Sequence, residues 1–453
     1  MSSPTKSNHR PYRALPGGPA KIPGRASRTA NEPRNIEKAM LPNGIRILTE
    51  RMTHVRSVSV GIWVATGSRR ETISENGISH FIEHMVFKGT AKRTAEDIAK
   101  SIDSIGGGLD AFTSKEMVSF NTKVLDEHLP IAFDMLADLV QNPKFDPEDI
   151  KREKQVVLEE IKMESDAPDY LIHEILCRNY YKGQSIGRSI LGRPANLRSF
   201  TRDTITDYFQ RVYEPRNIII TAAGNLHHDQ FVNLASDYFQ SAKRGPGAPK
   251  QEKPVSHAPV IMKDKPSLEQ VQVYLAAPCY PLTHKDRFAC YVLNAITGAG
   301  ISSRLFQSIR ERQGLCYAVS SELIMYRDTG MFAVYAATSP QTAQKLVRSV
   351  SEELGKLQES PVPADELRRA QDHIKGSFML GLESTTSRMS NLARQEMFYG
   401  RHVSMDEMLE EIETVTAAKV QKLAQEFFDP KRTAIAMLGP LSGVKVSRAD
   451  LNR

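Results

Sequence analysis

Hydrophobic and polar positions along this chain switch repeatedly between strand-like and helix-like spacing. The residues Val58 to Val64 are almost continuously apolar or alternate with serine, which predicts a strand. Ile98, Ile102 and Ile105 share one helical stripe, and residues 109–125 read as two paired strands. Helices are predicted over 75–85, 94–105, 129–140 and 147–164. This mixture predicts an α+β fold in which helices pack on an antiparallel-rich sheet.

The pattern then repeats later in the chain. The stretch that contains Pro215 and ends at Gly224 returns as the stretch that contains Pro430 and ends at Gly439, so both pairs are offset by 215 positions. Self-similarity at a fixed offset indicates a duplicated unit. The sequence therefore predicts two homologous α+β units of about 200 residues each.

Composition divides the chain into four parts. Residues 1–36, rich in proline, glycine and serine, are predicted to be a basic disordered tail. Residues 37–242 and 260–453 are the two predicted α+β domains, since 453 residues exceed one ordinary core. Residues 243–259 contain RGPGAPKQEKP and are predicted to be an extended linker.

The positive charge is concentrated in the tail. The formal net charge is +7, and residues 1–31 contain no acid but six basic residues: Lys6, Arg10, Arg13, Lys21, Arg25 and Arg28. The rest of the chain is therefore nearly neutral, and no nucleic-acid partner is expected. No apolar run approaches the roughly 18 residues that span a bilayer, so no membrane span is expected.

Cysteine usage and the tail bear on location. Four scattered cysteines without a C-x-x-C pair favour a reducing compartment. The tail lacks the apolar segment of a secretory signal, and its prolines and glycines oppose the amphipathic helix of a mitochondrial presequence. The expected location is cytoplasmic, with the mitochondrial matrix as the alternative if the tail is a transit peptide.

The strongest chemical signal is His80-Phe-Ile-Glu83-His84, inside one predicted helix. Histidines four positions apart lie on the same helical face, where neutral imidazoles make good zinc ligands. Glu83 borders that face and suits a general base for a zinc-bound water. The order H-x-x-E-H is the inverzincin signature of zinc peptidases. The structural alternative is three polar residues on an ordinary helix.

A catalytic zinc site also needs a third protein ligand and an open position. The helix predicted over 147–164 offers Glu153 and Glu160, two turns apart on one face, and Val156, Val157 and Ile161 give it apolar positions that should be buried. Carboxylates near a core are costly unless they have a partner. The residues alone leave the choice between Glu153 and Glu160 open.

The motifs HFIEHMVFKGT, REKQVVLEE and SIGRSILG together resemble the pitrilysin/insulysin family of inverzincin metallopeptidases. The resemblance spans residues 37–441, and it is nearest to single-chain bacterial members related to the mitochondrial processing peptidase beta subunit. It implies a clamshell, of which this chain would supply half, and a homodimer that completes it. It also implies one zinc ion per chain, with His80, His84 and Glu160 as ligands, Glu83 as base and Glu153 as a supporting carboxylate.

The second half resembles the family segment in which an arginine and a tyrosine hold the substrate. Arg310 and Tyr317 occupy those positions, seven residues apart, and are expected to bind the substrate backbone and stabilise the tetrahedral intermediate. At the repeat offset the zinc motif falls on residues 295–300, which have lost both histidines and the glutamate. One half is thus expected to hold the metal and the other to assist it.

The strand predicted near 109–113 matches the family strand on which peptide substrates lie. Added-strand binding uses main-chain hydrogen bonds and demands little of the substrate sequence. Ala111 and Phe112 are expected to flank the scissile bond. The structural alternative is an ordinary internal strand.

These features predict a zinc endopeptidase that hydrolyses unfolded or extended peptides inside a closed chamber. Two other functions remain open at this stage. One is a subunit of a hetero-oligomeric processing peptidase that needs a partner chain. The other is a catalytically silent scaffold, like the respiratory-complex core proteins that resemble this family.

Overall fold

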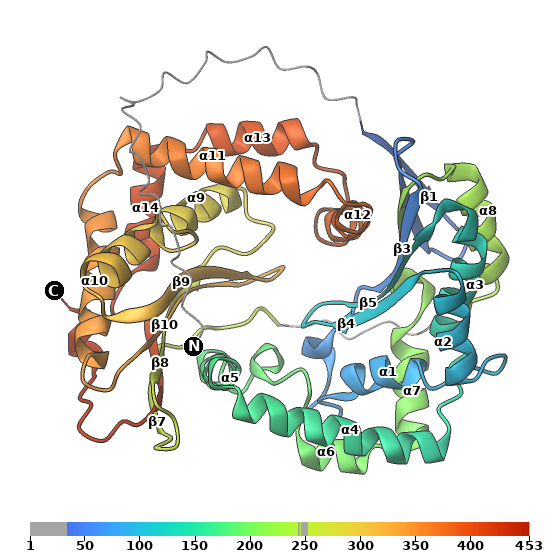
Figure 1. The fold of residues 1–453 in the computed structure, drawn as a ribbon, viewed down its shortest axis with the longest axis horizontal. Coiled ribbons are helices and arrows are strands. Elements are labelled where there is room, and N and C mark those ends of the chain that lie inside the picture. The colour runs from blue at the N-terminus through green and yellow to red at the C-terminus, as the bar shows by residue number, and fades with distance from the viewer. Residues whose placement is uncertain (1–33, 243–244, 246–251, 453) are drawn as a thin grey trace, which may run out of the picture. The chain divides into compact units, whose positions relative to one another are not determined.

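The computed structural model describes residues 34–242, 245 and 252–452, which form two β-sheets packed with helices (Figure 1). The first sheet has the strand order β1-β2-β6-β3-β5-β4, and the second has the order β7-β11-β8-β10-β9. The predicted α+β class is therefore confirmed. Residues 1–33 of the predicted tail, and 243–244 and 246–251 of the predicted linker, lie outside the described residues.

The first unit carries six strands and eight α-helices among its described residues. Its strands are β1 (Asn35–Met40), β2 (Arg46–Arg51), β3 (Ser57–Val64), β4 (Gly108–Thr113), β5 (Val118–Leu125) and β6 (Ile218–Gly224). Its helices are α1 (Ile78–Val86), α2 (Ala95–Ser104), α3 (Leu129–Gln141), α4 (Pro147–Asp166), α5 (Pro168–Tyr180), α6 (Pro194–Ser199), α7 (Arg202–Val212) and α8 (His228–Phe239). Short 3-10 turns are η1 (Ser68–Arg70), η2 (Asp126–His128), η3 (Ser185–Gly187) and η4 (Pro215–Asn217).

The second unit begins its regular structure at β7, after the predicted linker. Its strands are β7 (Val260–Asp264), β8 (Val271–Cys279), β9 (Cys316–Met325), β10 (Gly330–Thr338) and β11 (Ala434–Gly439). Its helices are α9 (Arg287–Thr297), α10 (Ala343–Glu359), α11 (Ala364–Gly381), α12 (Thr385–Tyr399), α13 (Met405–Glu413) and α14 (Ala417–Phe427). A π-helical segment, η5 (Phe306–Arg312), precedes β9, and the 3-10 turn η6 (Arg448–Leu451) follows β11.

The two sheets have the same topology. In each, one pair of neighbouring strands is parallel (β2 with β6, β7 with β11), and the remaining registered pairs are antiparallel. The order β2-β6-β3-β5-β4 corresponds strand for strand to β7-β11-β8-β10-β9, and β1 is an addition to the first sheet. The internal repeat seen in the sequence therefore corresponds to a repeat in structure.

Each unit also contributes one helix that packs on the sheet of the other unit. Helix α5 of the first unit packs on β8 and β11, and helix α12 of the second packs on β2, β3 and β6 (Figure 1). Leu176 of α5 is buried in a cluster with Ala276 and Met331 of the second sheet. Leu392 of α12 is buried in a cluster with Trp63 of the first sheet. The sequence did not predict this exchange.

Two local expectations need correction. Helix α1 begins at Ile78 and not at 75, because Gly77 has a left-handed backbone with φ 102° and ends the preceding turn. Val156 is 50% exposed, so α4 buries Val157 but not its neighbour.

β1 begins at Asn35, within the range assigned to the tail, and the boundaries of the four predicted parts stay predictions.

Across residues 34–242, 245 and 252–452, every helix is too short or too polar to cross a bilayer.

Candidate metal centre

The two histidines of the predicted site lie on α1, a helix of nine residues. Its opposite face is fully buried in the core of the first unit, with no exposed surface at Phe81, Ile82, Met85 and Val86. An isolated helix this short is not stable in water, so these apolar contacts hold it in place. His80 and His84 follow one another by one turn, with their ring centroids 4.6 Å apart.

The two candidate glutamates lie on α4, which packs against α1. Asp146 caps the start of α4 by accepting a hydrogen bond from the backbone N–H of Glu148, and Pro147 occupies the first turn. Ile150 and Val157 anchor the helix in the core. Its carboxylates on that side therefore face α1.

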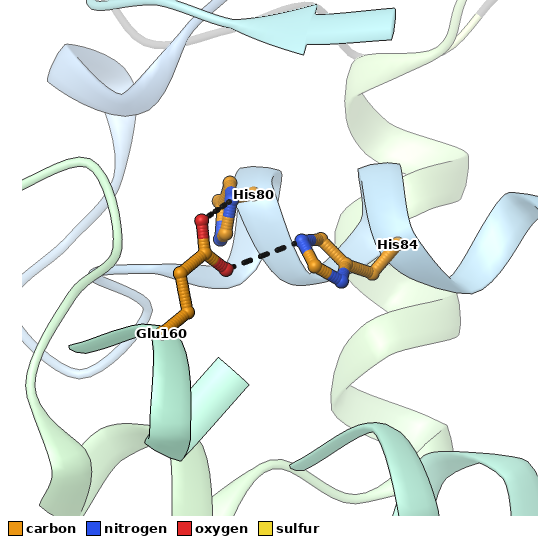
Figure 2. A group of neighbouring side chains, drawn as sticks. All are labelled: His80, His84 and Glu160. Atoms are coloured by element: carbon orange, nitrogen blue, oxygen red, sulfur yellow. Dashed lines mark ion pairs between the residues drawn. The ribbon is translucent and has the colours of Figure 1, made fainter. Parts of the chain in front are cut away.

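His80, His84 and Glu160 converge on one point (Figure 2). Nε2 of His80 lies 3.6 Å from Oε1 of Glu160, and Nε2 of His84 lies 3.4 Å from Oε2 of the same carboxylate. One ligand atom from each residue lies within 4.8 Å of the others. Two imidazole nitrogens and one carboxylate oxygen form a donor set that suits zinc with an open fourth position.

Glu153 occupies a different place from Glu160. Its Oε1 accepts a hydrogen bond of 2.9 Å from Nδ1 of His84, on the far side of that ring from Glu160. Its Oε2 lies 2.7 Å from the ammonium of Lys88. Glu153 is thus almost fully buried with both oxygens paired, and it fixes the His84 ring with Nε2 directed at Glu160.

The histidines differ in charge preference because their surroundings differ. Burial lowers the pKa of His80 to about 4, although the Glu160 carboxylate opposes the shift. Burial also lowers the pKa of His84, but hydrogen bonds to Glu153 and Glu160 outweigh it and raise the net value to about 9. The same His84 contact holds the pKa of Glu160 below its usual range.

Glu83 lies beside the cluster and contacts the edge strand of the first sheet. Its Oε2 accepts a hydrogen bond of 2.5 Å from the Thr113 hydroxyl, at the end of β4. Burial raises the pKa of Glu83, while the Thr113 hydrogen bond lowers it. A carboxylate with a raised pKa is better matched to accepting a proton near neutrality.

β4 is the last strand of the sheet and pairs only with β5 among the described strands. Ala111 and Phe112 therefore lie on an edge strand, and their expected place beside a scissile bond stays a prediction. The Phe112 side chain is 40% exposed, and its ring meets Trp63 edge-on at 5.9 Å. An open edge presents unpaired backbone groups to another strand.

Arg310 and Tyr317 lie together in the second unit. The Arg310 guanidinium is 5.1 Å from the centre of the Tyr317 ring and 4.5 Å from that of Phe306. Tyr317 is the second residue of β9, and 80% of its surface is exposed. Within the part of the chain that the structure describes, no hydrogen bond, ion pair or ring contact joins this pair to the metal-ligand cluster.

Unsatisfied atoms test whether a metal fits the cluster. The buried Oε2 of Glu160 makes no hydrogen bond of good geometry, because its nearest polar neighbour, Nε2 of His84, lies 3.4 Å away. A buried carboxylate oxygen that is so weakly satisfied is costly, and a cation at the point where these ligand atoms converge would satisfy it. The donor set and this oxygen therefore fit a zinc ion.

Comparison with known proteins is consistent with this geometry. A family model described as Insulinase (Peptidase family M16) matches residues 46–193, and one described as Peptidase M16 inactive domain matches residues 199–374. A Bacillus subtilis protein called the uncharacterized zinc protease YmxG is 40% identical over 405 residues, covering 89% of this chain and 98% of the relative. An uncharacterized zinc protease of Mycobacterium leprae is 35% identical over 426 residues, covering 93% and 96%.

The fold agrees with these sequence matches. The crystal structure of a protease from Helicobacter pylori superimposes with a TM-score of 0.84 at 21% identity, covering 89% of this chain and 99% of that one. At this identity the likeness is one of fold. Because the two family models and the relatives extend over most of the chain, this protein belongs to the insulinase family of peptidases, M16. The predicted family resemblance is confirmed.

Several side chains at the site had no signal in the sequence. Thr113 contacts Glu83, and Lys88 contacts Glu153, but both contacts depend on the packing of α1 against a strand and a helix distant in sequence. Glu71 accepts hydrogen bonds from the start of α1 although it precedes the helix by seven positions. No periodicity or spacing rule identifies such partners.

Proposed function

We propose that this protein is a zinc endopeptidase that hydrolyses unfolded or extended peptides. The observation that carries the proposal is the convergence of His80, His84 and Glu160 within 4.8 Å, beside Glu83 on the same helix. The names of the relatives support zinc and proteolysis in general terms. We propose the substrate class and the roles of the individual residues in addition.

In this proposal His80, His84 and Glu160 are the metal ligands, with one zinc ion per chain. When bound, zinc supplies a Lewis acid that lowers the pKa of a coordinated water toward about 7 and polarises the scissile carbonyl. Glu153 orients His84 by accepting its Nδ1–H, and Lys88 holds Glu153 in turn. This arrangement favours Glu160 over Glu153 as the third ligand.

Glu83 is proposed as the general base. It accepts the proton of the attacking water and then donates that proton to the leaving amine nitrogen as the peptide bond breaks. Two observations support the role: its carboxylate lies on the helix that bears both histidines, and burial raises its pKa. The Thr113 hydroxyl holds the carboxylate at the end of β4.

The substrate is proposed to bind along β4 as an added antiparallel strand. The open edge supplies main-chain donors and acceptors, so affinity would depend little on the substrate sequence. Ala111 and Phe112 would then flank the scissile bond, directly before the residue that contacts Glu83. A folded protein does not offer a free extended strand, which restricts substrates to unfolded segments and peptides.

Arg310 and Tyr317 are proposed to bind the substrate backbone and to stabilise the oxyanion. Their mutual contact and the exposure of Tyr317 leave both groups available to a ligand. We further propose a homodimer, which would supply four α+β units and a closed chamber. Four free cysteines support a cytoplasmic location.

The test of this proposal is the change Glu83→Gln in the purified chain. Removal of the base should lower turnover of an internally quenched extended peptide by about 10²- to 10⁴-fold while zinc content stays near one per chain. Glu159→Gln is the matched control, because Glu159 neighbours Glu160 but is exposed and, among the described residues, pairs with Lys162 alone. Unchanged turnover in Glu83→Gln would contradict the mechanism.

The unmodified chain separates the proposal from its two rivals. A chain that binds no zinc under metal analysis would be a silent scaffold. A chain that binds zinc but cleaves only after addition of another protein would be a subunit of a hetero-oligomeric peptidase.

A further inference from the structure

The start of α1 has no cap of its own. Gly77 is the residue before the first helical turn, and it has no side chain with which to accept from the helix. The first backbone N–H groups of any helix lack partners within the helix and must be satisfied elsewhere when they are buried. His80 is the third residue of α1, so whatever holds these groups also bears on a proposed metal ligand.

The partner is Glu71, which lies outside the helix. Its Oε2 accepts hydrogen bonds from the backbone N–H of Gly77 at 2.8 Å and from the Asn76 side-chain amide at 3.1 Å. Its Oε1 accepts from the backbone N–H of Ser79 at 2.9 Å. Glu71 itself is 3% exposed. One carboxylate therefore replaces the missing cap and completes the first turn of the helix.

The segment 185–192, whose sequence SIGRSILG belongs to the family resemblance, holds this turn from the other side. The Asn76 amide also donates to the carbonyl of Ser189 at 2.9 Å. Gly192 lies close against this turn, since a Cβ on Gly192 would meet the Asn76 carbonyl oxygen at 2.3 Å and the Gly77 Cα at 2.6 Å. Arg188 donates to the backbone carbonyl of Glu71 at 3.0 Å.

The anchored turn leads directly to the histidine. Ser79 is bound through its backbone to Glu71 and through its hydroxyl to Tyr208 of α7 at 2.8 Å. His80 follows Ser79 in the chain, and its Nδ1 is buried without a hydrogen-bond partner. His84 is oriented by Glu153, but no such side chain orients His80 among the described residues. The position of its ring therefore depends on the backbone of the first turn.

We propose that Glu71 is a positioning residue that, with the segment 185–192, fixes the first turn of α1 and so places His80 for metal binding. This inference rests on the proposed zinc function, since it assigns Glu71 a task toward the metal through His80. Partners that orient metal ligands typically change metal affinity by about 10- to 100-fold when removed.

The hydrogen-bond donors around Glu71 favour the ionised form of its side chain. All three are N–H groups, so a carboxylate can accept from each of them, whereas a neutral carboxamide would bring an NH2 against an N–H. Burial raises the pKa of Glu71 to about 7, while the bonds from Gly77 and Ser79 favour the ionised form. Lys115, Arg188 and Tyr208 are the titratable groups that interact with it. At pH 8 the Glu71 side chain is therefore mainly ionised, and measurements at this pH report on its carboxylate form.

The test compares Glu71→Gln with Glu214→Gln in the full chain at pH 8. Glu214 is a matched control, since it is 2% exposed and also accepts from a backbone N–H, that of Gly245, away from α1. Zinc affinity, measured by competition with a chromophoric chelator, should fall about 10- to 100-fold in Glu71→Gln and less than about threefold in Glu214→Gln. The visible spectrum of the Co²⁺-substituted protein should change only in Glu71→Gln.

Amide hydrogen exchange gives a readout that does not depend on metal. Exchange over residues 77–84 should accelerate in Glu71→Gln and stay unchanged in the control. Wild-type zinc affinity and unchanged exchange in a folded Glu71→Gln would overturn this inference and leave the zinc function intact. A wild-type chain without zinc affinity would overturn the proposed function, and exchange would still decide whether Glu71 anchors the turn.

A milder variant covers the case in which Glu71→Gln does not fold. Asn76→Ala removes one of the three donors and the link to Ser189, but it leaves the carboxylate in place. Zinc affinity should fall about three- to tenfold, in the same direction and with the same change in the Co²⁺ spectrum. Affinity equal to wild type in Asn76→Ala, with unchanged exchange over 77–84, would overturn the inference.

Discussion

The two repeats of this chain share a sheet topology and differ in nearly every residue of the metal site. The repeat offset of 215 carries His80 to Ala295, Glu83 to Gly298 and His84 to Ala299. It also carries α4 onto α11, where Arg368 and Lys375 stand at the positions of Glu153 and Glu160. Both carboxylates have become cations, so the second unit keeps the scaffold without any of the donors.

Local packing explains why the second unit cannot simply regain the site. A Cβ on Gly298 would meet the backbone nitrogen of Ser321 in β9 at 2.6 Å, and that N–H donates to the Gly298 carbonyl. In the first unit the corresponding helix approaches its edge strand through the side chains of Glu83 and Thr113. A glutamate at position 298 would have no room. The shared sheet topology therefore does not require these side chains, which are present in the first unit and absent at the offset positions of the second.

The sharpest test of this contrast is a matched pair of changes at equivalent positions. Glu160→Gln should remove the anionic ligand and lower peptide turnover by at least about a thousandfold, because a catalytic metal contributes several kcal/mol to the transition state. Lys375→Gln should leave turnover within about twofold, since in the described part of the chain Lys375 pairs with Asp372 and Glu413 and with no other acid. Zinc stoichiometry and quenched-peptide kinetics measure both.

Equal effects of Glu160→Gln and Lys375→Gln would contradict the proposed difference between the two units. A Glu160→Gln protein with full zinc and full turnover would mean that the first unit does not hold the metal through α4. A large loss in Lys375→Gln would mean that the second unit contributes to the site in a way that its charges do not suggest.

A smaller effect is expected from the second unit's proposed contribution. Tyr317→Phe removes one oxyanion donor and should lower kcat by about 10²-fold while zinc content stays at the wild-type level. Steady-state kinetics with metal analysis checks both quantities. Loss of zinc in Tyr317→Phe would contradict the proposed role, because a residue that only stabilises the oxyanion should not affect metal binding.

The proposed homodimer would also allow a test of which chain supplies the tyrosine. Mixed dimers of Glu83→Gln with Tyr317→Phe regain one intact site only if the tyrosine acts on the partner's metal centre. Recovery of activity on mixing would assign the residue to the partner, and its absence would assign it to its own chain.

The exchanged helices should matter equally to both units. Leu392→Ala in α12 and Leu176→Ala in α5 each empty a fully buried position, which should lower the free energy of unfolding by about 3 kcal/mol. Urea denaturation of the chelator-treated protein measures this. Val156→Ala is the control, since that side chain is half exposed and should change stability by less than about 0.5 kcal/mol. An effect in only one helix would show that the exchange is one-sided.

The sequence predicted the elements of the site better than their partners. Regular spacing placed both histidines on one helix, and the offset of 215 revealed the duplicated unit, because both are properties of local order along the chain. The choice between Glu153 and Glu160 stayed open from the residues alone, since both lie on the same helical face and differ only in which edge of the His84 ring they meet. That difference is set by the packing of α1 on α4.

Contacts between residues distant in sequence could not be predicted from the sequence for the same reason. The start of α1 was predicted three residues too early, because a helical pattern does not reveal that Gly77 has a positive φ or that Glu71 supplies the cap. The exposure of Val156 depends on which face of α4 meets the core. The places of α5 and α12 depend on strands of the other unit that lie about 90 residues or more away in the chain.

The exchange of α5 and α12 also bears on how such a chain could arise. Each repeat covers the apolar face of its sheet with a helix from the other, so a single repeat on its own would expose that face and leave its helix without a binding surface. A protein made of one repeat could bury both only by pairing with a second copy and trading helices with it. The present molecule has the architecture expected of such a domain-swapped dimer whose two copies are joined in one chain.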